Sequence, residues 1–269
     1  MRLSAISLAI TRIDRAGAAG FSPLSLFASG EVGAWYDPSD LSTMFQDSAG
    51  TTPVTADGQP VGLILDKSGR GNHASQATTA ARPLYKTDGT YHWLKFDGVD
   101  DTLSTAAIDL TGTDKISVFA GVRKTSGTPA YQNIVENTTL QGSFSVFGPG
   151  DSDNYYFTLG GTTRASLKTQ NFVSPHLAVI SLNFDISGAT RATEIFPRVN
   201  SAIPTLTGAD ATDAGTGNFG NNILYLGSRN GNSLYNAGNV HSIIVRGALS
   251  TAQEITNTET WVNQRTGAY

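Results

Sequence analysis

The chain has 269 residues, enough for one large all-β domain, and its 15% charged residues together with 29 glycines are typical of many short strands joined by turns. A net charge of -4 argues against a nucleic-acid-binding protein, which would carry a basic patch or stripe. Because the sequence has no cysteine, it excludes disulfides, thiolate zinc sites, iron–sulfur clusters and cysteine nucleophiles.

Residues 1–30 differ in composition from the rest of the chain. They are first apolar, then basic, then rich in glycine, alanine and serine. We interpret them as an arm and linker that docks the protein on a partner. The opening run resembles a signal peptide, but it is short and Arg12, Asp14 and Arg15 follow at once, so a secreted protein is the alternative. No window reaches the roughly 18 consecutive apolar residues of a membrane span.

From Val32 onward the chain consists of short runs in which apolar and polar residues alternate. In 116–124 this alternation places Ile116, Val118, Ala120 and Val122 on one face. A period of two predicts half-buried strands with one face toward the core and the other toward solvent. The further runs of this kind are 143–148, 154–160, 177–186, 222–228 and 240–247.

One helix is predicted, near the C-terminus, because Ser250 as N-cap and Gln253 three residues later form a capping box and Gly267 provides a stop. No strand alternates with a long amphipathic helix, which disfavours a parallel architecture. The predicted fold is therefore all-β: a two-sheet antiparallel sandwich or jelly roll with one short C-terminal helix. The residues expected on the buried side of the helix are Ala252, Ile255, Trp261 and Val262.

Three aspartates, Asp97, Asp100 and Asp101, cluster within five positions after a strand-like run. They do not form a helix–loop–helix calcium loop, because the sixth position is threonine and the twelfth is isoleucine. Two interpretations stay open: a calcium site built from several loops, or a turn in which these side chains accept local backbone N–H groups. Phe96 and Leu103 are expected as core anchors on either side. The sequence predicts no cofactor, with calcium as the open alternative.

No catalytic residue is assigned. Of the five glutamates none has an acidic partner two residues away on the same strand face, although pairs from separate strands stay open. The four histidines are isolated, and we interpret His241 as a satisfied sheet histidine rather than a base.

Several aromatic residues are candidates for stacking on sugar rings: Trp35, Trp93, Tyr131, Tyr155 and Tyr156. Because adjacent side chains of a strand point to opposite faces, one of Tyr155 and Tyr156 is expected to face outward and to be exposed or at an interface. The candidate ligand contacts are Tyr155 and Tyr156, together with Arg229, Asn230 and Asn232 of a Gly/Asn-rich loop.

Four segments taken in order resemble one family: GAWYD (33–37), DKSGRGNHA (66–74), LKFDGVDDTL (94–103) and VHSIIVRGALS (240–250). They are similar to motifs of the concanavalin A-like, laminin-G-like jelly roll. The resemblance spans about residues 32–265 and implies two stacked antiparallel sheets in one domain, 31–269. It also implies glycan binding, protein adhesion or, occasionally, glycan hydrolysis. The closing segment departs from the family, since His241 and Ser242 stand where an acidic pair is common.

The opening of this region, with WYDPSD (35–40), FQDSAG (45–50) and DKSGRGNH (66–73), resembles modules of bacteriophage and prophage virion proteins. The resemblance implies a non-enzymatic virion structural protein: a tail, baseplate or fibre module. Its partners would be other virion proteins, reached through the arm, and a host-surface glycan, and it would form a homo-oligomer in the particle. The alternatives are a capsid decoration protein without a ligand, a glycan hydrolase, and a secreted lectin.

Overall fold

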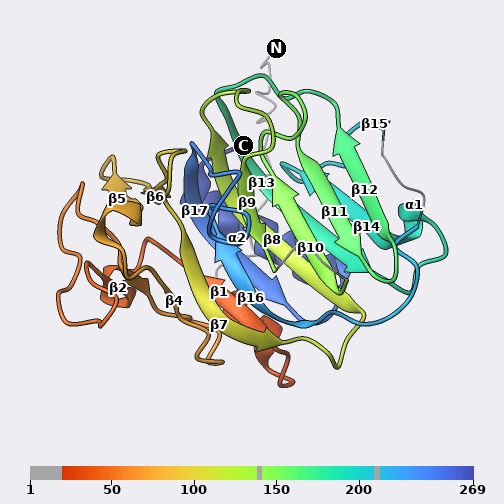
Figure 1. Ribbon diagram of the computed structural model, residues 1–269, viewed down its shortest axis with the longest axis horizontal. Coiled ribbons are helices and arrows are strands. Elements are labelled where there is room, and N and C mark those ends of the chain that lie inside the picture. The colour runs from red at the N-terminus through yellow and green to blue at the C-terminus, as the bar shows by residue number, and fades with distance from the viewer. Residues whose placement is uncertain (1–19, 138–140, 209–212) are drawn as a thin grey trace, which may run out of the picture.

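The computed structural model describes residues 20–137, 141–208 and 213–269. Residues 1–19 of the predicted docking arm thus lie outside the described residues. Two antiparallel β-sheets stack face to face, and one long helix lies on an outer side of the sandwich (Figure 1). The predicted two-sheet antiparallel sandwich with a C-terminal helix is confirmed.

The first sheet has seven strands within the described residues, all paired antiparallel. In spatial order they are β14 (Ile195–Val199), β13 (His176–Asp185), β8 (Lys115–Lys124), β17 (Asn239–Arg246), β6 (His92–Lys95) and β5 (Leu84–Thr87), with β1 (Gly33–Tyr36) also paired to β17.

The second sheet has ten strands within the same residues. In spatial order they are β15 (Leu206–Gly208), β12 (Arg164–Thr169), β11 (Tyr156–Gly160), β10 (Ser143–Phe147), β9 (Asn133–Glu136), β16 (Asn221–Leu226), β7 (Leu103–Asp109), β4 (Ala74–Ser75), β3 (Leu63–Ile64) and β2 (Met44–Phe45). The helical segments are η1 (Pro23–Phe27), η2 (Leu41–Thr43), η3 (Thr79–Ala81), α1 (Arg191–Glu194) and α2 (Ala252–Thr266).

The main core lies between the inner faces of the two sheets, where alternate side chains of each strand meet. The face predicted for β8 is confirmed, because Ile116, Val118, Ala120 and Val122 all belong to this core. The two residues predicted to anchor the acidic loop, Phe96 and Leu103, are also buried in it.

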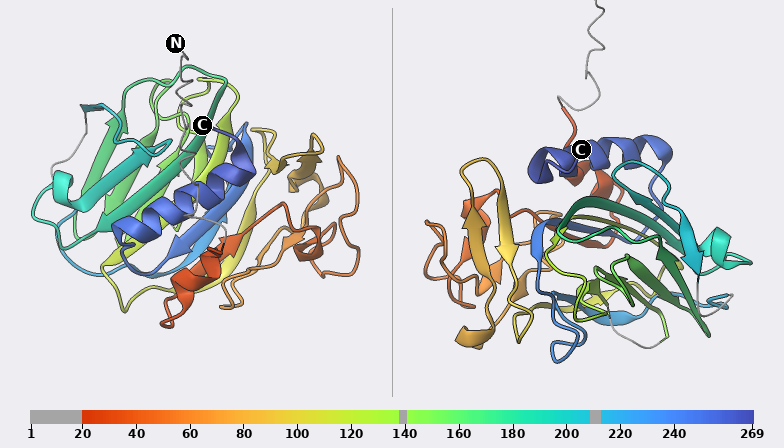
Figure 2. Two further views of the ribbon diagram at one scale, coloured as in Figure 1. Left: turned by 180° about the vertical axis from the view of Figure 1, so that it is seen from behind. Right: turned by 90° about the horizontal axis from the view of Figure 1, so that it is seen from above.

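The outer face of the seven-stranded sheet is covered by α2, which packs on β13, β8 and β17 (Figure 2). Trp35 of β1 meets Trp261 of α2 edge to face, with 5.4 Å between ring centroids, and Phe119, Val179 and Ile244 complete a second core. The expectation that these strands turn one face to solvent is therefore wrong for β8 and β17. Their second face alternates as predicted but is buried by the helix.

The start of α2 differs by one residue from the prediction. Thr251, not Ser250, is the N-cap, and its capping box is formed with Glu254 rather than Gln253. Ser250 is unsuited to this role because it is buried and its hydroxyl lies 3.3 Å from the Arg246 guanidinium, which donates to it. Gly267 ends the helix in the left-handed conformation, as predicted. On the helix, Trp261 and Val262 are buried, Ile255 is partly buried and Ala252 is exposed.

The last residues of the predicted linker contribute to the second core. Leu26 and Phe27 of η1 are buried there beside α2, and Phe21 packs against the same cluster. The boundary predicted at residue 30 thus assigns two core side chains to the linker, and the described packing begins near Phe21.

The motif at 66–74 has a structural role. The Asp66 carboxylate accepts hydrogen bonds from the backbone N–H of Trp35 at 2.9 Å, of Ser68 at 2.8 Å and of Asn72 at 3.0 Å. One buried carboxylate thus closes its own loop and holds that loop against β1. Part of the family-like sequence pattern is explained by this loop.

Candidate ligand-binding face and acidic loop

Tyr155 and Tyr156 lie on opposite sides of the ten-stranded sheet, yet both are buried, with 0% and 5% exposure. Tyr155 belongs to the main core, where its hydroxyl hydrogen-bonds His176 Nδ1 at 2.9 Å. Tyr156 is on the outer side, where other aromatic rings cover it. Tyr156 thus points to the outer side, as strand alternation predicts, but neither ring is exposed, because Tyr131 and Phe147 pack against Tyr156.

The ring that reaches the surface beside Tyr156 is Tyr131, which is half-buried. It stands edge-on to Tyr156 at 5.7 Å and to Phe147 at 6.1 Å between ring centroids. Phe147 and Tyr156 are cross-strand partners on β10 and β11, so their rings form a buried base for Tyr131.

Arg229 rests on the same base. Its guanidinium carbon lies 5.1 Å from the Phe147 ring centroid, and Arg229 Nε is 3.5 Å from Glu136 Oε2. Glu136 is fully buried on β9 and also accepts hydrogen bonds from Asn133 Nδ2, Ser145 Oγ and the Asn230 backbone N–H. Burial raises the pKa of Glu136, and the nearby Arg229 charge opposes this rise. The carboxylate thus positions the Arg229 loop from below.

The loop after β16 brings the other predicted residues to this surface. Asn230 adopts a left-handed backbone with φ of 50°, and Arg229 N–H donates to the Ser233 carbonyl at 2.7 Å, closing a tight turn. Asn232, within that turn, is exposed. We call the surface made by Tyr131, Arg229, Asn230 and Asn232 the Tyr131–Arg229 face. The structure thus brings together three predicted ligand contacts and one aromatic residue from the candidate group.

The three aspartates converge in one loop. Each offers a carboxylate oxygen, and these atoms all lie within 4.8 Å of one another. Asp101 Oδ2 accepts the Asp97 N–H at 2.9 Å, while Asp97 Oδ1 accepts the Val99 N–H at 2.8 Å. Both interpretations of the sequence are thus represented: the side chains form a hydrogen-bonded turn, and they also place hard oxygen ligands close together.

Asp101 is the buried member of this cluster. Desolvation, together with the charges of Asp97 and Asp100, raises its pKa from 3.8 to about 7. A bound cation would favour the ionised carboxylate and lower this pKa. The geometry is the argument for an ion: Asp97, Asp100 and Asp101 would supply three of the roughly six to eight oxygen ligands that calcium takes.

The acidic loop and the loop carrying Arg229 are neighbours. Thr102 Oγ1 lies 2.6 Å from Ser228 Oγ, and the Phe96 N–H donates to the Gly238 carbonyl at 2.9 Å. A Cβ on Gly227 would lie 2.2 Å from the Phe96 ring, so the two loops leave no space between them there. The acidic loop is therefore packed directly against the start of the loop that carries Arg229.

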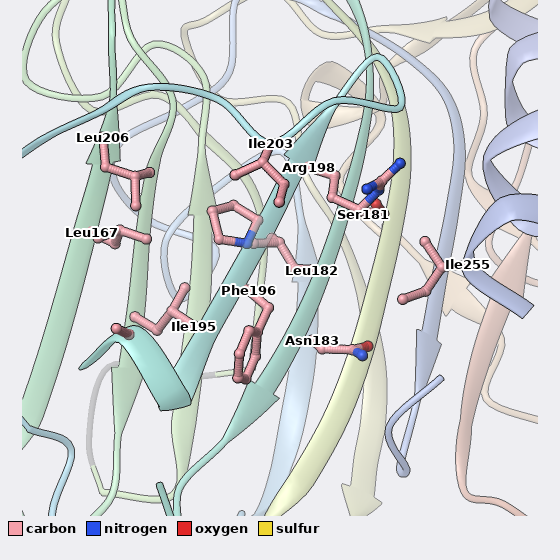
Figure 3. A pocket seen from close by; sticks show the side chains of 12 residues that line it. Leu167, Ser181, Leu182, Asn183, Ile195, Phe196, Arg198, Ile203, Leu206 and Ile255 are labelled. Atoms are coloured by element: carbon pink, nitrogen blue, oxygen red, sulfur yellow. The ribbon is translucent and has the colours of Figure 1, made fainter. Parts of the chain in front are cut away.

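An apolar groove opens at another side of the sandwich, around the edge strand β14 (Figure 3). It has a volume of about 280 Å³, and its exposed side chains Phe196, Ile203 and Leu206 are 45%, 76% and 45% accessible. Contiguous exposed apolar side chains are typical of surfaces that contact proteins, membranes or ligands. Pro197 in β14 has no N–H, which opposes the addition of a further strand at this edge.

Sequence reasoning missed Glu136 and Phe147 and did not select Tyr131 from the candidate aromatics. Glu136 is one of five glutamates in the sequence, and its signal was weak: a carboxylate that directly follows Ile134 and Val135 in a short strand needs a partner. That partner, Arg229, is more than ninety residues away in the sequence.

Among the described residues, no helix is long and apolar enough to cross a membrane.

No protein-family model matches the sequence, and no curated protein matches it. The fold is similar to solved structures of botulinum neurotoxins. The type C protein has a TM-score of 0.53 at 10% identity, covering 74% of this chain and 48% of that chain. The serotype G binding domain has a TM-score of 0.52 at 12% identity, with the same coverage of 74% and 48%. The DC binding domain in complex with rat synaptotagmin II has a TM-score of 0.53 at 9% identity, covering 74% and 49%. The chain therefore spans about half the length of these proteins, and the likeness concerns the β-sandwich fold.

Proposed function

We propose that this protein is a non-enzymatic binding module that contacts a glycan through the Tyr131–Arg229 face. The observation that carries the proposal is the placement of a half-exposed tyrosine ring and a partly exposed guanidinium on one buried aromatic base, beside the exposed Asn232. An aromatic ring can pack on the apolar face of a sugar, and arginine and asparagine can bind its hydroxyls. Glu136 and the tight turn hold the polar groups in place before a ligand binds.

The structural neighbours support a binding role. Botulinum neurotoxin type C depends on interaction with two ganglioside molecules to enter cells, and the DC binding domain has been solved with rat synaptotagmin II. These proteins thus use glycan and protein contacts. At about 10% identity the support extends to the type of module and not to the ligand.

We further propose that calcium binds the acidic loop. The support is the convergence of three carboxylates, one of them buried, directly beside the loop that carries Arg229. The ion would fix the loop on which the binding face rests.

We also propose that the protein acts in a bacteriophage particle, as the sequence resemblance implies, and that it meets other copies there through the apolar groove. Residues 1–19 contain Leu3, Ile6, Leu8, Ile10 and Ile13, and 19 residues can extend roughly 60 Å. The proposed occupant of the groove is this segment of a neighbouring copy. Mass spectrometry of purified particles tests the location, since absence of the protein from them would refute it.

The binding proposal is tested by applying the purified protein to immobilised glycans and to bacterial surface polysaccharide. We expect saturable binding that weakens about tenfold or more in Tyr131→Ala and in Arg229→Ala, because each removes a direct contact. Arg164→Ala, an exposed arginine on β12, is the matched control and should bind as the unmodified protein does. Depolymerisation of the polysaccharide would show a hydrolase and contradict the proposal, as would binding that both variants leave intact.

A further inference from the structure

A separate cavity of about 420 Å³ lies on the outer face of the seven-stranded sheet, at the end of α2. Its size is within the range of small-molecule sites, about 300–1,000 Å³. It lies apart from the Tyr131–Arg229 face, which belongs to the other sheet. The side chains that matter for its chemistry are Asp88, Tyr91, Trp93, Arg123, Asn239 and His241.

A β-bulge places His241 at this cavity. Val240 pairs with Val122 and Ser242 pairs with Gly121, so His241 has no partner on β8. The extra residue turns both His241 and Ser242 toward the outer face, while Val240 and Ile243 point into the core. Strand alternation alone would not place the imidazole here. These two residues are also where the closing segment departs from the family pattern.

The polar groups that converge here are unusually poor in partners. Both ring nitrogens of His241 are buried without a hydrogen bond, so the interpretation of a satisfied sheet histidine is wrong. Asn239, which is buried, and Arg123, which is exposed, are cross-strand partners, and neither side chain forms a hydrogen bond or ion pair within the described part of the chain. Leaving the buried His241 ring without a hydrogen bond is unfavourable, because its nitrogens have lost water and gained no partner. Burial lowers the pKa of His241 to about 4, so the ring is neutral near pH 7.

The apolar side of the cavity is aromatic. Trp93 is half-buried and its ring lies 5.5 Å from the His241 ring, inclined by 41°. The chain has three tryptophans, and the other two, Trp35 and Trp261, are each only 6% exposed. Trp93 is thus the tryptophan with a ring surface open to a ligand.

The rim of the cavity is already ordered. In the turn between β5 and β6, Asp88 Oδ1 accepts the Thr90 N–H at 2.9 Å and the Tyr91 N–H at 2.8 Å. Tyr91 in turn packs against the end of α2, since a Cβ on Gly267 would lie 2.4 Å from its hydroxyl. Little rim ordering would therefore remain to be done when a ligand binds.

We propose that this cavity binds one sugar ring, whose apolar face stacks on Trp93 while its hydroxyls hydrogen-bond to Arg123 and Asn239. A sugar ring matches the site because it combines a C–H face, attracted to the negative face of an aromatic ring, with a rim of hydroxyls that both donate and accept. The unpartnered amide and guanidinium supply both kinds of hydrogen bond. The cavity is thus a second glycan site, independent of the Tyr131–Arg229 face.

The test is a titration of tryptophan fluorescence with methyl glycosides of glucose, galactose and N-acetylglucosamine, and with glucuronic and sialic acids. We expect a saturable change with at least one of them. If the acidic sugars bind more tightly, the group that Arg123 contacts is the sugar carboxylate. If the neutral sugars bind more tightly, it is a hydroxyl. Arg123→Ala should weaken binding about tenfold or more. Arg164→Ala should leave it unchanged.

Trp93→Ala should abolish binding. Saturation-transfer NMR measures binding by this variant, which lacks the reporting tryptophan. Trp93→Phe keeps an aromatic ring and should restore most of it, which separates stacking from a general loss of structure. Absence of saturable binding by every sugar overturns the inference. Binding lost only in Tyr131→Ala and Arg229→Ala also overturns it while leaving the proposed function in place. Binding lost only in the Trp93 and Arg123 variants supports it and removes the Tyr131–Arg229 face from the proposed function.

Discussion

At the scale of single residues, Asp101 is a buried carboxyl group close to two other acids, and its ionisation lowers the stability of the folded protein. Its pKa is about 7 in the folded protein against an ordinary value of 3.8. The folded state therefore binds a proton that the unfolded state has already released between about pH 4 and pH 7. Stability from this group is fully present below pH 4 and is lost as the pH rises to 7.

Asp101→Asn should remove this pH dependence while keeping an oxygen that accepts the Asp97 N–H. We expect the variant to be at least as stable as the unmodified protein at pH 7.5, and the difference to vanish near pH 4. Urea denaturation at several pH values measures it. A variant that follows the pH profile of the unmodified protein would contradict the assigned pKa.

Calcium is predicted to reverse the loss of stability that the ionised Asp101 carboxylate causes near pH 7. At pH 7.5 the ion should raise the midpoint of thermal unfolding of the unmodified protein, because it binds only the folded acidic loop. Asp101→Asn should abolish most of this increase, and magnesium at equal ionic strength is the control for screening. No increase with calcium would leave the loop as a hydrogen-bonded turn.

Gly227, at the start of the loop that carries Arg229, packs against Phe96 beside the acidic loop with no room for a side chain. Gly227→Ala should destabilise the protein by about 2 kcal/mol or more, since the new Cβ meets the buried Phe96 ring at a backbone φ of 82°. Gly69→Ala is the matched control, with φ of 80° and nothing within 4 Å. Comparing the two by chemical denaturation separates the clash from backbone strain. Equal losses would show that Phe96 gives way.

At the scale of elements, the first turn of α2 depends on the hydroxyl of its N-cap residue, Thr251. Thr251→Ala should lower the free energy of unfolding by about 1 kcal/mol, because it breaks the capping box with Glu254. Thr256→Ala, an exposed position within the same helix, should change stability by less than half of that. If the two variants behave alike, the cap contributes nothing measurable.

The strands were more predictable than the surfaces they form. Alternation identified β8 and its core face because the period of two is local, and Phe96 and Leu103 could be recognised as anchors from the same pattern. It could not reveal that α2 covers the second face of β8, since that depends on a helix more than 120 residues later. Nor could it place His241, because a one-residue bulge reverses the facing that alternation predicts. The Tyr131–Arg229 face depends on β9, β10 and β16 lying side by side, and the sequence does not state that order.

At the scale of the whole molecule, the groove around β14 is the surface where association with other copies is proposed. Ile203→Asp should shift the protein toward the monomer in sedimentation equilibrium, because a charge would be buried in an apolar contact. Ile10→Asp, in the proposed occupant, should have the same effect. Val173→Asp is the control, as that valine is 78% exposed and does not line the groove. Unchanged association in both test variants would refute this occupant.

The position of β17 in the seven-stranded sheet has a consequence for folding during translation. This strand pairs with β8, β6 and β1, yet it comes from residues 239–246, more than 110 residues after the last of those three strands. While the ribosome is still making the preceding residues, β1 and β6 lack their neighbour and their apolar faces stay uncovered. Folding of this sheet must wait until residues 239–246 have been made, and a nascent chain stalled before residue 239 should remain sensitive to proteases and available to chaperones.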